Sequence, residues 1–106
     1  MSIADGADYI YKSFYNWDNV PAGTCDLRYW TQESFRTYTK KGLLLDENYI
    51  EIRSYYTLIA KFFPLTGTQE VYYRYKGGSR TTQRVIHAIC SRFNMSTTTW
   101  DSLMEG

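Results

Sequence analysis

The sequence has few of the residues that build catalytic and metal centres, since its 106 residues include one histidine and two cysteines. His87 stands between Ile86 and Ala88 without a second ligand at metal-binding spacing, so the sequence indicates neither a zinc site nor a hydrolytic triad. Cys25 and Cys90 are too few for a disulfide framework or a thiolate metal site, and we interpret both as small apolar residues. We therefore expect a protein that is not an enzyme and that holds no metal ion and no cofactor.

Hydrophobic runs of transmembrane length are missing too, and the N-terminus lacks the basic segment and apolar stretch of a signal peptide. These absences predict a cytoplasmic protein that does not bind membranes. The sequence has no internal repeat and no low-complexity tract. Its content of 43% hydrophobic and 22% charged residues is typical of a folded domain, and a chain of this length supports one hydrophobic core. We expect a single domain over residues 1–106.

Acidic residues are missing from residues 71–100. The whole chain has a net charge of only +1, and residues 1–70 contain seven Lys and Arg against nine Asp and Glu. Residues 71–100 contain His87 and five basic residues, which are Arg74, Lys76, Arg80, Arg84 and Arg92. Acids return only at Asp101 and Glu105. The positive excess therefore lies in this basic segment, and we expect the contact surface there.

The N-terminal part of the chain predicts two helices. Residues 2–16 form the first, with Ser2 as its N-cap and apolar residues at helical spacing. A loop with proline and glycine follows. Residues 31–42 form the second, with Glu33 in its first turn and Gly42 at its C-terminal end.

The middle of the chain fits two structures. At a period of two, residues 49–54 alternate between apolar and polar side chains, which predicts a hairpin around a turn at residues 46–48. At a period of 3.6, apolar and aromatic residues between Ile52 and Phe63 share one helical face. Because β-branched and aromatic residues dominate, we favour a small antiparallel sheet, with residues 70–76 as a returning strand.

The C-terminal part predicts a helix pair. Gly77 and Gly78 end the returning strand, and Ser79 caps a helix over residues 80–93. Ser96 caps a second, shorter helix. The sequence thus predicts an α+β fold, a small single domain with N-terminal helices, a small antiparallel sheet in the middle and a C-terminal helix pair. An all-α bundle is the alternative.

The stretch "AICSRFNMSTTTWDSLM" resembles a helix-turn-helix DNA-binding segment. Ile89 and the small Cys90 match the first helix, residues 93–95 match the turn, and Trp100 and Leu103 match the inward positions of the second helix. The resemblance covers only the last quarter of the chain. It implies a homodimer as one oligomeric state, which the sequence leaves open.

The resemblance also implies which side chains would contact DNA. The second helix would present polar side chains to the major groove, and the first would present cations to phosphates. The groove-facing residues would be Thr97, Thr98, Thr99, Asp101 and Ser102. The phosphate contacts would be Arg80, Arg84 and Arg92.

The strand predicted over residues 70–76 has a second functional interpretation. Tyr73 and Tyr75 would stack on bases, while Arg74 and Lys76 would contact phosphates. Alternation of this kind is equally typical of ordinary strand packing with a charged outer face.

Two functions remain open from the sequence. The first is a nucleic-acid-binding regulator that contacts DNA or RNA through its basic, tyrosine-containing C-terminal third. The second is an interaction protein of the type carried by phages and mobile elements. Such a protein would inhibit a host nucleic-acid-handling enzyme or defence complex by docking on a host protein, and Tyr and Arg are residues that anchor protein interfaces.

Overall fold

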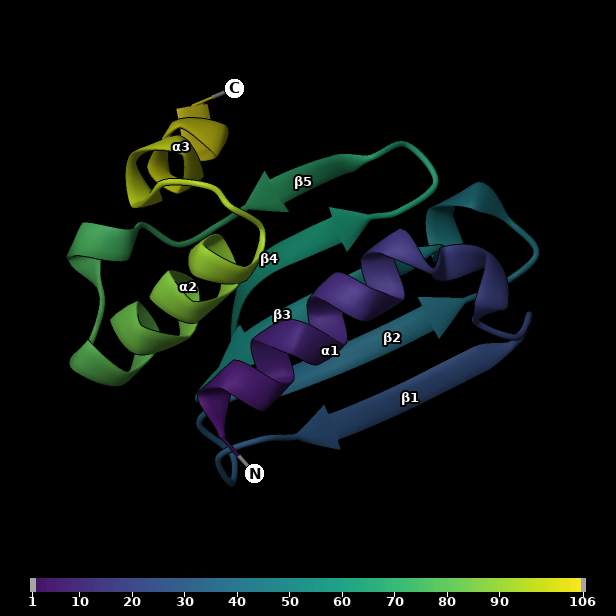
Figure 1. Cartoon of the computed structure of the whole chain (residues 1–106), viewed down its shortest axis with the longest axis horizontal. Helices are drawn as coiled ribbons and strands as arrows, with labels where there is room; N and C mark the ends of the chain where they lie inside the picture. Colours follow the sequence, from purple (N-terminus) through teal and green to yellow (C-terminus); the bar gives the residue numbers. More distant parts are fainter. Residues whose placement is uncertain (1, 106) are drawn as a thin grey trace.

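Helices and strands lie in two layers, with the helices on one face of a single sheet (Figure 1). The computed structural model describes residues 2–105, and these residues form three α-helices and five strands. The helices are α1 (Ile3–Tyr15), α2 (Arg80–Arg92) and α3 (Thr97–Ser102). The strands are β1 (Thr24–Tyr29), β2 (Arg36–Lys41), β3 (Tyr49–Ser54), β4 (Thr57–Phe63) and β5 (Thr68–Val71). The predicted α+β class is confirmed, and the all-α alternative is wrong.

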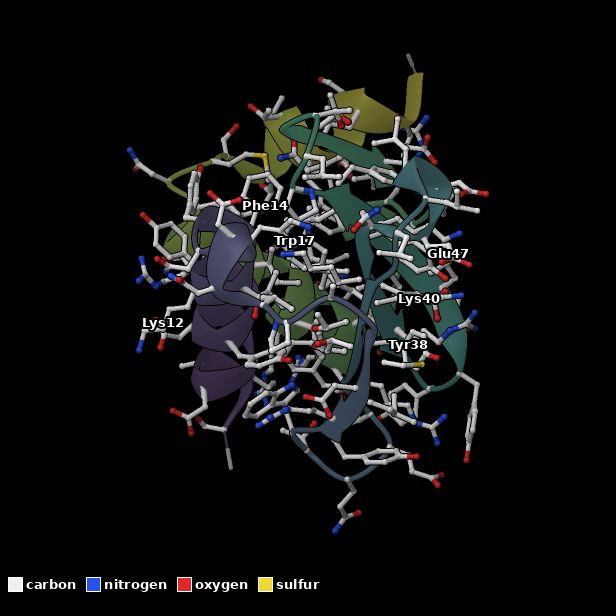
Figure 2. All side chains as sticks on the ribbon, turned by 90° about the vertical axis from the view of Figure 1, so that its right-hand side faces the viewer. Lys12, Phe14, Trp17, Tyr38, Lys40 and Glu47 are labelled. Atoms are coloured by element: carbon white, nitrogen blue, oxygen red, sulfur yellow. The ribbon has the colours of Figure 1, made fainter. Side chains whose placement is uncertain are left out.

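The sheet is a meander in which each strand pairs antiparallel with the next one along the chain. One row of paired residues crosses four strands on the side of the helices and is buried. Its members are Thr37, Ile52, Ala60 and Val71. No α-helix of the described residues covers the other side of the sheet, which we call the open face. In Figure 2, Phe14 and Trp17 lie between α1 and the sheet, whereas Tyr38 and Lys40 point away from α1.

The first predicted helix is confirmed as α1, which begins with a capping box. The Ser2 hydroxyl accepts a hydrogen bond from the Asp5 backbone N–H at 3.2 Å, and the Asp5 carboxylate accepts one from the Ser2 N–H at 3.0 Å. Gly6 lowers helix propensity, but it stands where α1 crosses Phe35. A Cβ atom at Gly6 would overlap the Phe35 ring, so the glycine permits this close packing.

The helix predicted over residues 31–42 is wrong, because Arg36–Lys41 forms β2 between β1 and β3. Thr37 and Thr39 are buried under the helices, and Tyr38 and Lys40, which alternate with them, lie on the open face. This alternation is that of a strand, and β-branched and aromatic residues suit it. Gly42, which we took for a helix end, follows the last residue of the strand. The described chain therefore has one N-terminal α-helix instead of two.

The small antiparallel sheet predicted for the middle of the chain is confirmed, and the helical alternative is wrong, because residues 49–63 form the hairpin of β3 and β4. Its turn consists of Tyr55 and Tyr56, with φ of 50° and 69°. Two central residues with positive φ are typical of a type I′ turn, which favours Asn and Gly. For bulky side chains this backbone conformation is strained.

The turn predicted at residues 46–48 overlaps the 3-10 turn η2 (Leu45–Glu47), but the predicted strand pairing there is wrong. Residues 43–45 do not form a strand, and β3 pairs with β2 instead. The η2 turn is part of the connection between these two strands. Three consecutive leucines consequently lie exposed in the connection. They are Leu43, Leu44 and Leu45.

The C-terminal helix pair is confirmed as α2 and α3, with both predicted N-caps. Ser79 Oγ accepts a hydrogen bond from the Thr82 N–H at 3.2 Å, and Ser96 Oγ accepts one from the Thr99 N–H at 3.0 Å. Asn94, in the turn between the helices, has a φ of 54°, which Asn adopts more readily than most residues. The pair joins the same core as α1 and the sheet through its buried side chains. These are Val85, Ile86, Ile89, Cys90 and Trp100.

Candidate nucleic-acid interface

The segment between β5 and α2 does not continue the sheet. The strand predicted over residues 70–76 is wrong beyond Val71, where β5 ends. Side chains of α3 bind the backbone that follows: Trp100 Nε1 donates to the Tyr73 carbonyl at 2.9 Å, and the Tyr75 N–H donates to Asp101 Oδ1 at 2.7 Å. Backbone groups that α3 satisfies in this way no longer need a strand partner.

Tyr73 and Tyr75 are half-buried and pack against the core. The Tyr73 ring lies over the backbone of Gly78, where a Cβ atom would overlap it. Tyr75 starts the 3-10 turn η3 (Tyr75–Gly77) that leads to α2. The two rings therefore do not lie on one face of a strand as the sequence predicted, and packing accounts for Tyr73.

Three residues of α2 form an exposed surface with two arginines, which we call the basic face: Arg80, Arg84 and His87. Their spacing of four and three residues places them on one side of the helix. Together with Tyr75 and Gln83 they line a hollow of about 290 Å³. The structure thus brings two of the predicted phosphate-binding arginines together.

The basic face is electrostatically unbalanced. Among the described residues, no carboxylate forms an ion pair with Arg80, Arg84 or the neighbouring, exposed Lys76. The first turn of α2 contains no acidic residue and begins with Arg80. Because the N-terminus of a helix carries partial positive charge, a cation there is unfavourable and an anion is favourable. An anionic ligand would relieve this imbalance.

Arg92 does not line the hollow of the basic face, although it lines a neighbouring hollow together with His87. Its Nε atom is 2.9 Å from Asp8 Oδ1 on α1, and its guanidinium carbon is 3.5 Å from the centre of the Tyr11 ring. Hydrogen bonds from Lys12 and Arg92 lower the pKa of Asp8 below its ordinary value. Arg92 therefore joins α2 to α1 through a carboxylate that it shares with Lys12.

The remaining predicted contacts are dispersed. Arg74 is exposed before η3, Thr97 is half-buried in the first turn of α3, and Thr98 is exposed. None of these three lines the hollow of the basic face. Asp101, which the helix-turn-helix resemblance placed in the groove, is half-buried and bound to the Tyr75 backbone.

The open face carries aromatic and charged residues that the sequence analysis missed. It presents Tyr38 and Lys40 from β2, because Thr37 and Thr39 face the helices. Arg36 lies in the same row, with its guanidinium carbon 3.7 Å from the Tyr56 ring centre and 5.0 Å from that of Tyr29. The two-residue alternation between positions 36 and 40 was the signal for this face, and the predicted helix over residues 31–42 concealed it.

The two cysteines differ, and the interpretation of both as small apolar residues fits the buried Cys90 but not the exposed Cys25. Cys90 is buried, and its burial raises the pKa of the thiol to about 11. Cys25 is exposed on the open face, where its thiol hydrogen-bonds with the Tyr38 hydroxyl. This bond is the main reason that the pKa of Tyr38 is raised.

Other recognisable sites are missing from the part of the chain that the structure describes. It contains no group of three or more His, Cys, Asp or Glu side chains arranged to hold a metal ion. None of its helices combines the length and apolar surface needed to cross a bilayer. No protein-family model, curated protein or solved structure matches this chain, so the case for a function rests on the geometry of its own residues.

Proposed function

We propose that this chain is a non-enzymatic nucleic-acid-binding regulator whose basic face contacts the phosphate backbone. The observation that carries the proposal is the group of Arg80, Arg84 and His87 around one hollow at the N-terminal half of α2. Two permanent cations and an imidazole, which can donate a hydrogen bond, lie on one side of the helix and form a surface for a row of phosphates.

The charge arrangement supports this function over a purely structural role. Surface arginines that stabilise a fold commonly pair with acids, as Arg92 pairs with Asp8. Arg80 and Arg84 have no such partner among the described residues, and Arg80 stands in the first turn of α2, where the helix dipole disfavours a cation. A ligand with negative charge offsets both costs, which accounts for the arrangement.

The tyrosines have a smaller role in this proposal than in the sequence-based hypothesis. Tyr75 lines the hollow beside the arginines, so its exposed edge is available to a sugar or base. Tyr73 serves the fold, since its ring covers Gly78 and its carbonyl accepts from Trp100. Binding through phosphates with one aromatic neighbour gives weak sequence preference.

Fluorescence anisotropy with labelled single-stranded and duplex DNA and RNA tests the proposal. Arg80→Ala and Arg84→Ala should each lower affinity about three- to ten-fold across unrelated sequences, as expected for a lost phosphate contact. Lys40→Ala is the matched control, because it removes the same charge from the open face and should change affinity less than two-fold.

Two outcomes would contradict the proposal. Absence of binding to every oligonucleotide near 0.1 M salt would favour the competing hypothesis, in which the same cations dock on an acidic surface of a host protein. A larger loss with Lys40→Ala than with Arg84→Ala would move the nucleic-acid site to the open face.

A further inference from the structure

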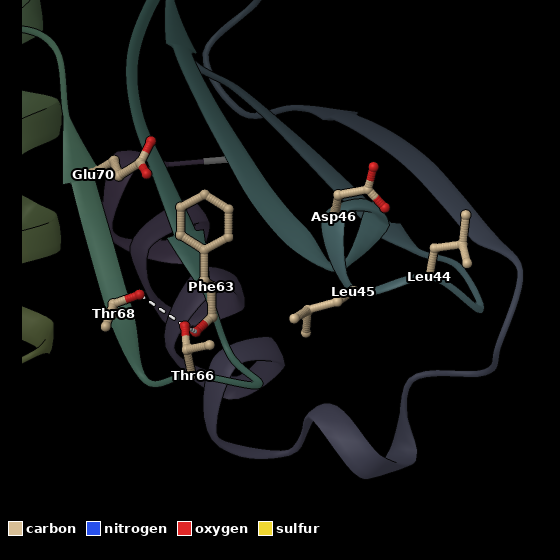
Figure 3. Close-up of a pocket in the computed structure, with 7 residues that line it drawn as sticks. All are labelled: Leu44, Leu45, Asp46, Phe63, Thr66, Thr68 and Glu70. Atoms are coloured by element: carbon tan, nitrogen blue, oxygen red, sulfur yellow. Dashed lines mark hydrogen bonds between the residues drawn. The ribbon is translucent and has the colours of Figure 1, made fainter.

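A second hollow lies at one end of the open face, away from the basic face. It has a volume of about 550 Å³ and is lined by the η2 turn and the β4–β5 hairpin. In Figure 3, Leu45 points from η2 toward β4, where the ring of Phe63 stands. The Glu70 carboxylate lies beside that ring, and Asp46 lines the hollow from η2 on the opposite side, with its carboxylate directed away from the ring. Leu44, Thr66 and Thr68 complete its wall.

We propose that this hollow, which we call the leucine hollow, docks a segment of a partner protein that presents an apolar side chain next to a lysine or arginine. The inference does not depend on the proposed function. It concerns different residues, on the sheet face opposite to the helices, and a different class of ligand.

The exposed leucines are the first argument. Leu43, Leu44 and Leu45 are 92%, 63% and 66% exposed. Three consecutive exposed apolar residues are unusual on a soluble domain and are typical of an interaction site. Leu45 also lines the hollow beside Phe63, so the apolar surface is concave and suits an inserted side chain.

The leucines are held outward by an ordered turn. The Glu47 N–H donates to the Leu44 carbonyl at 3.1 Å, and the Asn48 N–H donates to the Leu45 carbonyl at 3.3 Å. The buried Asn48 side chain also donates to the Leu44 carbonyl. Because these bonds fix the turn, the leucine hollow exists before a partner arrives, which reduces the entropic cost of binding.

The charges at the rim indicate which partner fits. Asp46 and Glu70 both line the hollow, and neither forms an ion pair among the described residues. Lys61 lies opposite Glu70 in the sheet register, but its ammonium nitrogen is 4.8 Å from the centre of the Tyr49 ring. The hollow thus combines an apolar floor with negative charge that a cationic side chain would complement.

The same charges argue against a second copy of this chain as the occupant. A symmetric dimer through the hollow would bring Asp46 and Glu70 of one chain toward the same residues of the other. Like charges in such a contact oppose association. A basic partner segment meets no such repulsion.

Two matched peptides test the proposal by NMR titration of the full ¹⁵N-labelled chain. The probes are Ac-Gly-Phe-Arg-Gly-NH₂ and Ac-Gly-Phe-Glu-Gly-NH₂, which differ only in charge. The arginine peptide should shift the amides of Leu45, Asp46, Thr68 and Glu70 and bind about five-fold more tightly than the glutamate peptide.

Variants separate the apolar and ionic parts of the site. Asp46→Asn with Glu70→Gln should remove the preference for the arginine peptide. Leu45→Ser should weaken both peptides at least three-fold, whereas Leu65→Ser should leave both unchanged, since Leu65 is also exposed but lines a different hollow. Amide spectra that keep their dispersion establish that each variant is folded.

Three results would overturn the proposal. Equal affinity of both peptides would show that the carboxylates do not select a cationic partner. Amide shifts confined to other parts of the sheet would show that the peptides bind elsewhere. A concentration-dependent dimer in sedimentation that Leu45→Ser abolishes would make a second copy the occupant. The Asp46→Asn, Glu70→Gln variant should keep the oligonucleotide affinity of the wild type, because the basic face is intact in it. This measurement separates a failure of the leucine hollow from a failure of the proposed function.

Discussion

Arg92 of α2 binds Asp8 of α1, with 2.9 Å between Nε and Oδ1. The guanidinium group also lies over the Tyr11 ring at 3.5 Å. These contacts join the two helices that cover the sheet. They separate Arg92 from Arg84, although the sequence placed both in one basic segment.

The first prediction follows from this difference. Arg92→Met should lower the midpoint of thermal unfolding, because the contacts of Arg92 with Asp8 and Tyr11 that join α2 to α1 are lost. It should change oligonucleotide affinity less than two-fold. Arg84→Met should do the reverse, with an unchanged midpoint and weakened binding. Circular dichroism melts and anisotropy titrations of both variants measure the two effects, and equal losses of affinity would contradict the separation.

The second prediction concerns acid stability. Hydrogen bonds from Lys12 and Arg92 lower the pKa of Asp8 in the folded chain below its ordinary value of 3.8. A carboxyl with a lowered folded pKa adds stability above its unfolded pKa and loses it as the pH falls through the folded value. Asp8→Asn should therefore lower the free energy of unfolding at pH 7. The difference in this free energy between variant and wild type should shrink as the pH falls through the folded pKa of Asp8. A constant difference between pH 7 and pH 2 in urea melts would contradict this account.

The third prediction concerns the β3–β4 turn, where Tyr55 has a φ of 50°. Asn adopts this conformation more easily, so Tyr55→Asn should raise the free energy of unfolding by about 1 kcal/mol. Tyr55→Phe keeps both the ring and the strain and is the matched control, with no expected change. Urea denaturation of both variants measures the free energy of unfolding. If Tyr55→Asn left this free energy unchanged, the turn would not be strained.

The fourth prediction distinguishes packing from base stacking at Tyr73. Because the ring is half-buried over Gly78, Tyr73→Ala should destabilise the chain by about 2–4 kcal/mol. Tyr73→Phe keeps the packing and should retain both stability and oligonucleotide affinity. If Tyr73→Ala instead kept its stability and lost affinity, the ring would be a nucleic-acid contact.

Features that depend on neighbouring residues were predictable from the sequence. Ser2, Ser79 and Ser96 begin their helices because each hydroxyl accepts a bond from a backbone N–H three residues later. The alternation in residues 49–54 correctly gave β3, since a strand with one buried face repeats every two residues.

Features that depend on distant residues were not predictable. Residues 36–41 form a strand because they pair with β1 and β3, and the helices on one face of the sheet bury Thr37 and Thr39. These tertiary contacts override the apparent helix end at Gly42. The path of Tyr73 and Tyr75 depends on hydrogen bonds with α3, whose residues come about 26 positions later.

The candidate sites show the same division. The sequence identified the helix that carries Arg80 and Arg84, but it grouped them with Arg92 and did not include His87 among the contacts. The partner of Arg92 was not predictable, because Asp8 is 84 residues away along the chain. The leucine hollow required the register of β4 and β5 together with the connection between β2 and β3.

The salt dependence of oligonucleotide binding reports directly on the phosphate contacts of the basic face. The logarithm of the association constant should fall linearly with the logarithm of salt concentration for the wild type. For the Arg80→Ala, Arg84→Ala variant the slope should be shallower by about 1.4 on single-stranded DNA and about 1.8 on duplex, since two phosphate contacts are lost. An unchanged slope in the double variant, or wild-type binding that does not respond to salt, would contradict phosphate recognition by the basic face.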